Sequence, residues 1–154
     1  MIIKKATESD MPILLKFMMD LQRYEHMISN RVRADEKTKN MFKHFIRKRI
    51  NNPNYVFLIA IENGKPAGII TGWKEDVSNA YKNKHIGYIC QLIVNPLFQR
   101  RKIGKKLFDE ISMEFKKMGL RELKIEVLFK NNKGIKFWQS CGFKNLYREM
   151  RKDI

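Results

Sequence analysis

The spacing of apolar and polar residues along the 154-residue chain predicts a series of strands and helices. Short apolar runs predict strands at Ile2–Ala6 and His85–Val94. Two more apolar runs flank the Glu62–Lys65 segment, whose Asn-Gly pair is typical of a short hairpin turn. Residues Glu122–Phe129 alternate and predict a further strand, and we expect Phe143–Ile154 to supply the last one.

Apolar residues three or four positions apart predict four helices. We expect them to start at Asp10, near Asp35, near Ile103 and after a capping residue, Asn131. Their apolar stripes are Leu14, Phe17, Met18 and Leu21; Met41, Phe42, Phe45 and Ile46; Ile103, Leu107, Ile111 and Phe115; and Ile135, Phe137 and Trp138. Together, strands and helices follow the order β-α-α-β-β-β-α-β-α-β.

This order predicts one α+β domain over residues 1–154. We expect the third helix to end at Gly119 and the fourth at Cys141 and Gly142. A hydrophobic content of 44% fits a globular fold rather than a disordered chain. The sequence contains no linker, internal repeat or low-complexity tract.

Composition argues against several classes of protein. No stretch approaches the roughly 18 unbroken apolar residues of a membrane span. The N-terminal residues have no apolar segment of the kind found in a signal peptide. Cys90 and Cys141 are too few and too far apart for a disulfide framework. We therefore expect a cytoplasmic protein with reduced thiols and no membrane partner.

The formal net charge of +16 at pH 7 is the strongest compositional signal. Such a charge attracts polyanions, which include nucleic acid, an acidic membrane surface and a phosphate-bearing cofactor. The excess of cations runs along most of the chain, so a lysine-rich solvated surface explains it equally well. Charge alone does not select a function.

One basic loop stands directly before the third helix. Arg100, Arg101, Lys102 and Lys105 surround a single glycine, Gly104. A helix N-terminus carries unpaired amides and partial positive charge, and a glycine lets a ligand approach the backbone closely. The loop therefore favours phosphate binding, although a solvated basic turn is the simpler alternative.

The loop resembles the acetyl-CoA signature of the GNAT superfamily of N-acetyltransferases, Q/R-x-x-G-x-G/A after a strand that ends V-x-P. Gln99 matches its first position and Gly104 its last, whereas Lys102 replaces the middle glycine. The stretch NNKGIKFWQSCGF is similar to the family's late motif N-x-x-A-x-x-F-Y-x-x-x-G-F, with Trp138 where tyrosine is usual. The resemblance covers nearly the whole chain.

The resemblance implies a mixed, mostly antiparallel central sheet flanked by helices. Its fourth and fifth strands would splay apart to hold acyl-CoA, with acetyl-CoA as cosubstrate and no metal. The implied cofactor-binding residues are Leu92, Ile93, Val94, Gln99, Arg100, Arg101, Lys102, Ile103, Gly104, Lys105, Asn131, Phe137 and Trp138.

In the chemistry implied by the family, a neutral amine attacks the thioester carbonyl directly. The backbone amide of Ile93 is the candidate donor to the developing oxyanion. Gln91 occupies a position where relatives often carry an acid, but an amide cannot take up a proton. Glu126 is the candidate carboxylate base, with a surface ion pair to Lys124 or Lys130 as the alternative.

Protonation of the departing thiolate has no clear candidate either. Trp138 donates a hydrogen bond but is no acid near neutral pH, so we favour a packing role for it. Tyr147 or Tyr88 could substitute, but the sequence fixes the position of neither.

The acceptor amine is the least determined part of the reaction. Asp20, Glu25, Glu75 and Asp76 lie in segments expected to set specificity and could bind a cationic amine. The net charge of +16 instead steers anionic or zwitterionic amines toward the protein. We expect a small-molecule or peptide amine as the substrate.

Three further hypotheses remain open. The chain could be a non-catalytic acyl-CoA sensor on the same scaffold. It could bind nucleic acid through Arg47–Arg49 and the loop before the third helix, which we rank last because no row of aromatic side chains accompanies these cations. A sheet edge left open near the end of the chain could also be completed by a second copy, which would give a homodimer.

Overall fold

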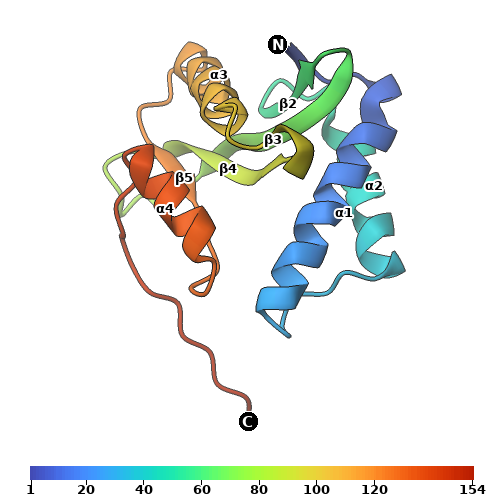
Figure 1. The fold of residues 1–154 in the computed structure, drawn as a ribbon. Helices are drawn as coiled ribbons and strands as arrows, with labels where there is room; N and C mark the ends of the chain where they lie inside the picture. The colour runs from blue at the N-terminus through green and yellow to red at the C-terminus, as the bar shows by residue number, and fades with distance from the viewer.

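The centre of the fold is a five-stranded sheet whose strands lie side by side in chain order (Figure 1). The computed structural model describes residues 1–154. The strands are β1 (Ile2–Lys5), β2 (Tyr55–Glu62), β3 (Lys65–Asp76), β4 (His85–Val94) and β5 (Leu123–Ile125). Neighbours from β1 to β4 are antiparallel, and β5 runs parallel to β4. The predicted α+β class with a mixed, mostly antiparallel sheet is confirmed.

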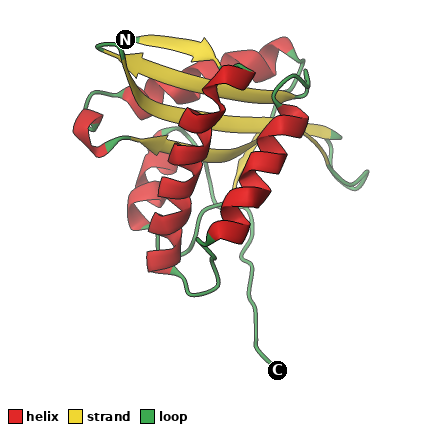
Figure 2. Ribbon diagram, turned by 90° about the vertical axis from the view of Figure 1, so that its right-hand side faces the viewer, coloured by secondary structure: helices red, strands yellow, loops and turns green.

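Helices cover both faces of this sheet. They are α1 (Met11–Ile28), α2 (Glu36–Arg49), α3 (Ile103–Lys117) and α4 (Asn132–Ser140), with short 3-10 helices η1 (Glu8–Asp10) and η2 (Pro96–Phe98). Figures 1 and 2 show α1 and α2 together on one face and α3 on the other, with α4 on the α3 side. None of these helices combines the length and apolar character needed to cross a membrane.

The core divides into two apolar layers because side chains on a strand alternate between its faces. Along β2, Val56 and Leu58 pack against α3, whereas Phe57 and Ile59 pack against α1 and α2. Both layers contain fully buried side chains, so β2 and β3 lie in the interior of the molecule. Packing on both faces therefore holds the sheet rigidly in place, and β4 of this sheet carries several candidate functional residues.

Local signals in the sequence explain where the elements turn and end. Asn63 and Gly64 both have positive φ, 50° and 72°, as a tight primed hairpin turn between β2 and β3 requires. After α3, Gly119 adopts a φ of 79°, and the Leu120 amide donates to the Phe115 carbonyl at 3.1 Å. This 6→1 hydrogen bond is the Schellman pattern of a glycine-terminated helix, so the predicted end of the helix is confirmed.

The predicted final strand is absent. Residues 143–154 have no regular secondary structure, and Leu146 and Met150 are 76% and 85% exposed. The segment lacks a partner because the neighbouring free edge belongs to β5, which is only three residues long rather than the eight predicted for Glu122–Phe129. The outer edge of β5 therefore has no strand beside it, and the homodimer stays a prediction.

Gly87 of β4 lies where α3 packs most closely on the sheet. A Cβ atom added there would lie 2.6 Å from a ring carbon of Phe115 and 2.7 Å from a methyl carbon of Leu123. Phe115 is fully buried, so a clash at its ring is costly to relieve. We expect Gly87→Ala to lower the free energy of unfolding, measured in urea, by about 1–3 kcal/mol.

Gly104→Ala is the matched control, because its added Cβ would meet the Phe137 ring at an ordinary 3.4 Å. We expect that variant to keep its stability within about 0.5 kcal/mol of the wild type. Equal unfolding midpoints for Gly87→Ala and the wild type would contradict the tight packing of α3 against β4.

Candidate functional site

The pairing of β4 with β5 stops halfway along β4. It covers three residue pairs and ends at Ile89 and Ile125. At this point the register between β3 and β4 also shifts, because Thr71 lies opposite Gln91 while Gly72 lies opposite Ile89, which leaves Cys90 as the extra residue of a β-bulge. Beyond the bulge, the edge of β4 that faces away from β3 has no strand partner. The predicted splay of the two strands is therefore present.

The direction of the backbone groups distinguishes the three residues at this open edge. The Asn95 amide donates to the Ala67 carbonyl of the β3 side at 2.8 Å. Alternate residues of a strand face the same neighbour, so Ile93 also faces β3. The backbone groups of Leu92 and Val94 face the open edge instead. The amide of Ile93, the expected oxyanion donor, therefore faces β3, and the amide of Leu92 is the one that faces the open edge.

The loop before α3 has an unusual backbone. Arg100 and Lys102 have φ values of 63° and 60°, in the left-handed region that residues other than glycine rarely adopt. Lys102 stands where the family signature has glycine, and it adopts the conformation that glycine would adopt. Lysine rather than glycine therefore occupies a left-handed backbone position in this loop.

This path brings free amides and cations together at the N-terminus of α3. The first bond of the helix runs from the Lys106 amide to the Lys102 carbonyl, so the amides of residues 103–105 have no intrahelical acceptor. Arg100, Arg101 and Lys102 are exposed and have no carboxylate partner within 4.0 Å. The arrangement suits an anion with several oxygen atoms.

Neighbouring side chains hold part of this loop in place. The Arg101 guanidinium lies 5.6 Å from the ring centre of Phe98, and Lys105 forms an ion pair with Asp109 one turn along α3. Gln99 accepts a hydrogen bond from Lys133 of α4 at 3.1 Å. The loop is therefore tied both to η2 and to α4.

The start of α4 lies beside the same loop and beside the end of α1. The Asn131 side-chain oxygen caps α4 by accepting from the Gly134 amide at 2.9 Å, as predicted. The same oxygen accepts from the Tyr24 hydroxyl of α1 at 3.2 Å. Phe137 of α4 faces Gly104 at van der Waals distance. Segments distant in sequence therefore meet around the open edge of β4.

Trp138 belongs to an aromatic cluster rather than to a polar site. Its ring packs edge-on against Phe108, Phe137 and Phe143, with centroids 5.0 to 6.0 Å apart. It forms part of the apolar layer between α3 and the sheet. These contacts agree with the packing role expected from the sequence.

The candidate proton-transfer residues differ in their surroundings. Gln91 is buried, and its side-chain oxygen accepts from the Thr71 hydroxyl at 2.5 Å. Glu126 is exposed and forms an ion pair with Lys124 at 3.0 Å. This is the surface ion pair expected from the sequence as the alternative to a catalytic base. Burial, followed by the charges of Cys90 and Glu126, raises the pKa of the Tyr88 hydroxyl, which therefore stays protonated.

Cys90 of β4 and Glu25 of α1 interact at this site, and they were not identified as a pair from the sequence. Burial raises the pKa of the Cys90 thiol to about 12, and the next largest cause is the negative charge of Glu25 on α1. Burial also raises the pKa of the Glu25 carboxyl. The bulge residue Cys90 therefore lies close enough to α1 for the Glu25 charge to act on its thiol, and the apolar pattern of β4 does not predict this pairing. No three His, Cys, Asp or Glu side chains group as metal ligands.

Comparison with known proteins agrees with this geometry. The family model described as the acetyltransferase (GNAT) family matches residues 17–143. N-alpha-acetyltransferase 30 of Dictyostelium discoideum is 30% identical over 99 residues, which cover 64% of this chain and 51% of that protein. The chain thus spans about half the length of this curated relative.

Solved structures share the fold. The tetramutant of the BH1408 protein from Bacillus halodurans superposes with a TM-score of 0.84 and 17% identity over the full length of both chains. A predicted acetyltransferase from Clostridium acetobutylicum, solved with acetyl-CoA, has a TM-score of 0.78 and 16% identity over 99% of this chain and 95% of its own.

The left-handed backbone at Lys102 generates a prediction about stability. A residue with a Cβ atom in this conformation is disfavoured by roughly 1–2 kcal/mol, part of which glycine recovers. We expect Lys102→Gly to raise the free energy of unfolding by about 0.5–1 kcal/mol in a urea titration. Lys102→Ala removes the same charge without relaxing the backbone and should give no such gain. Equal stabilities of the two variants would contradict the strain.

Proposed function

The chain belongs to the acetyltransferase (GNAT) family, and we propose that it transfers an acetyl group from acetyl-CoA to a primary amine. One observation supports this most strongly: the open edge of β4 lies next to a cationic loop with free helix amides. An elongated ligand with a phosphate end and an amide-bearing arm suits that combination.

We propose that the backbone groups of Leu92 and Val94 bind the pantetheine arm as an additional strand would. The loop residues Arg100–Lys105 would hold the pyrophosphate through their amides and side chains. Asn131, which caps α4, and Phe137 of α4 would border the other side of the arm. Gln99, already bonded to Lys133, would keep α4 close to the loop.

The chain's residues would act on the reaction mainly through position and electrostatics. The Leu92 amide faces the open edge and would donate to the thioester oxygen as negative charge develops on it. A Cys90 thiol with a pKa of about 12 is a poor nucleophile at neutral pH, which disfavours an acyl-enzyme. Direct attack by the amine is therefore the proposed route.

The acceptor proposed here is a primary amine on a small molecule or a peptide. The name of the Dictyostelium relative refers to acetylation at the α-amine of a chain, and a peptide N-terminus is accordingly one probe for the acceptor. Release of the CoA thiol in the presence of individual amines would identify the acceptor class. Binding of acetyl-CoA without any turnover would favour a non-catalytic acyl-CoA sensor.

Calorimetric titration with acetyl-CoA tests the position of the phosphate site. We expect the double variant Arg100→Ala/Arg101→Ala to bind roughly 10- to 100-fold more weakly than the wild type, because each arginine offers a charge-assisted hydrogen bond to phosphate. The loss should be larger at low salt, where such contacts are least screened.

Arg47→Ala/Lys48→Ala on α2 is the matched control, because both of its side chains are exposed and it removes the same charge elsewhere. We expect that control to bind acetyl-CoA within about threefold of the wild type, since only the general field changes. Equal weakening of both double variants would assign the effect to net charge and would reject the loop as the phosphate site.

A further inference from the structure

Four acidic residues were candidates for binding the acceptor amine, and they differ in whether a cation of the protein is already paired with them. Asp20 forms ion pairs with Lys16 and Arg23, both at the surface of α1. Asp76 pairs with His85, and Glu75 pairs with Lys124. The remaining residue, Glu25, has no ion pair and no side-chain hydrogen bond.

Besides Glu25, only Glu110 among the side-chain carboxylates of this chain has neither an ion pair nor a side-chain hydrogen bond. Lysine and arginine outnumber aspartate and glutamate by 32 to 16, so a cation is available to most carboxylates. Glu25 is half-buried, and burial without a compensating charge disfavours its ionised form. A carboxylate held in this state binds a proton or a cation more readily than an exposed one does.

Glu25 also lies at the right place relative to the open edge of β4. Its charge acts on the thiol of Cys90, the bulge residue that directly precedes the edge. The preceding residue, Tyr24, donates to Asn131 at the start of α4. The turn of α1 that carries Glu25 therefore borders the position proposed for the thioester, on the face of the sheet that α1 covers.

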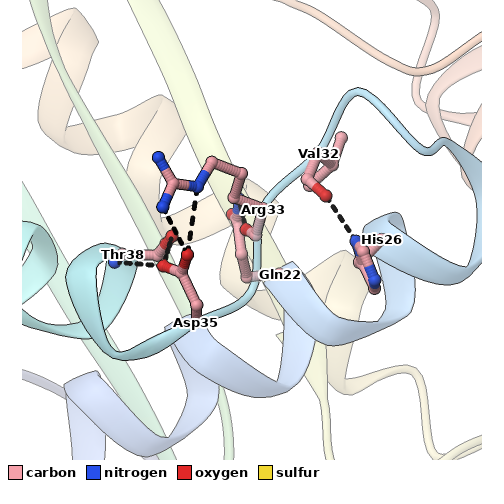
Figure 3. A network of polar contacts seen from close by, with 6 residues as sticks. All are labelled: Gln22, His26, Val32, Arg33, Asp35 and Thr38. Atoms are coloured by element: carbon pink, nitrogen blue, oxygen red, sulfur yellow. Dashed lines mark hydrogen bonds and ion pairs between the residues drawn. The ribbon is translucent and has the colours of Figure 1, made fainter.

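The last turns of α1 are fixed by the segment that follows them (Figure 3). The Gln22 side-chain amide donates to the Arg33 carbonyl at 2.7 Å, and the His26 ring bonds the Val32 carbonyl at 2.5 Å. These contacts hold α1 on both sides of Glu25 in sequence. The carboxyl is thereby positioned without being neutralised.

We propose that Glu25 accepts the proton that the acceptor ammonium must lose before its nitrogen attacks the thioester. The proposal rests on the acetyl transfer proposed above. The ammonium gives one proton to a Glu25 carboxylate oxygen, and the freed nitrogen lone pair forms the C–N bond. The C–S bond breaks with its electron pair on sulfur. The nitrogen then loses its second surplus proton, which the CoA thiolate takes up, so that a neutral amide and free CoA thiol are left.

The other titratable groups around Glu25 do not compete for this role. Cys90 and Tyr88 of β4 both have raised pKa values and stay protonated near neutral pH. Glu126, beyond β5, has Lys124 as its partner. Among these four residues, Glu25 alone can be ionised while no cation of the protein is paired with it. The ammonium of the acceptor would supply the missing positive charge.

The test compares Glu25→Gln with the wild type in acetyl-CoA turnover. The acceptor is whichever of benzylamine, glycinamide, Nα-acetyl-lysine amide, glucosamine and spermidine the wild type acetylates best. We expect kcat/KM of Glu25→Gln to fall roughly 100-fold at about pH 7, as for loss of a general base. The deficit should shrink toward about pH 9.5, because the amine then loses its proton to water.

A second acceptor separates proton transfer from a structural effect. An analogue of the chosen amine with enough electron-withdrawing substituents near the nitrogen to bring its pKa below about 7 arrives largely neutral at that pH. We expect Glu25→Gln to acetylate this analogue nearly as fast as the wild type does. Glu110→Gln is the matched control: Glu110 on α3 is also half-buried and unpaired, and its loss should change kcat/KM by less than about twofold.

Carbon-13 NMR of the glutamate carboxyls provides a readout that does not depend on activity. The resonance missing in Glu25→Gln identifies Glu25, and its titration midpoint in the wild type should lie above the ordinary glutamate value. A raised folded-state pKa means that stability rises as pH falls through it. Glu25→Gln should therefore be at least as stable as the wild type at neutral pH.

The outcomes distinguish this proposal from the function on which it rests. Equal activities of Glu25→Gln and the wild type would overturn the role of Glu25 and leave acetyl transfer intact. A deficit that is the same at every pH and with both acceptors would overturn proton transfer in favour of a structural role. A wild type that binds acetyl-CoA and acetylates none of the amines would overturn both.

Discussion

The end of the β4–β5 pairing is the constraint on which the other functional features depend. Parallel strands hydrogen-bond only while their registers stay aligned, and here the bulge at Cys90 interrupts β4 at the last paired residue, Ile89. Buried backbone groups need partners, so an unpaired strand edge in the interior of a fold is a binding surface for an extended ligand. The bulge residue, Cys90, also lies within reach of the Glu25 charge.

The cationic loop complements this edge through its backbone as much as through its charge. Arg100 and Lys102 accept an unfavourable left-handed conformation, which keeps the amides at the start of α3 directed outward together. An overall charge of +16 steers any anion toward the surface, but it does not select a position. In the function proposed here, selection would come from free amides and unpaired cations at one helix end, next to an edge that could hold the rest of the ligand.

Much of the fold follows from the sequence because its signals are local. The stripes of α1 to α4, the Asn63-Gly64 turn and the Gly119 cap each lie within a few residues of the structure they specify. The expected order of elements placed a last strand over residues 143–154, but a strand also needs a partner edge. The short β5 does not provide one, and its length depends on where β4 bulges.

The residues of the candidate site also differ in whether local sequence could identify them. The loop is contiguous and matches a known signature, so its residues could be named in advance. Glu25 could be named only as one acid among four, since its distinction is the absence of a partner, which depends on residues far away in sequence. The choice between Ile93 and Leu92 likewise depends on which way the backbone faces, and an apolar run in a sequence carries no such information.

Amide hydrogen exchange along β4, measured by NMR with and without acetyl-CoA, tests the central claim most directly. The amides of Leu92 and Val94 face the open edge and should exchange more than about tenfold more slowly in the complex, whereas the amide of Ile93 faces β3 and should change little. Unchanged exchange at Leu92 and Val94, with protection confined to the basic surface of α2, would show that the ligand does not lie along β4.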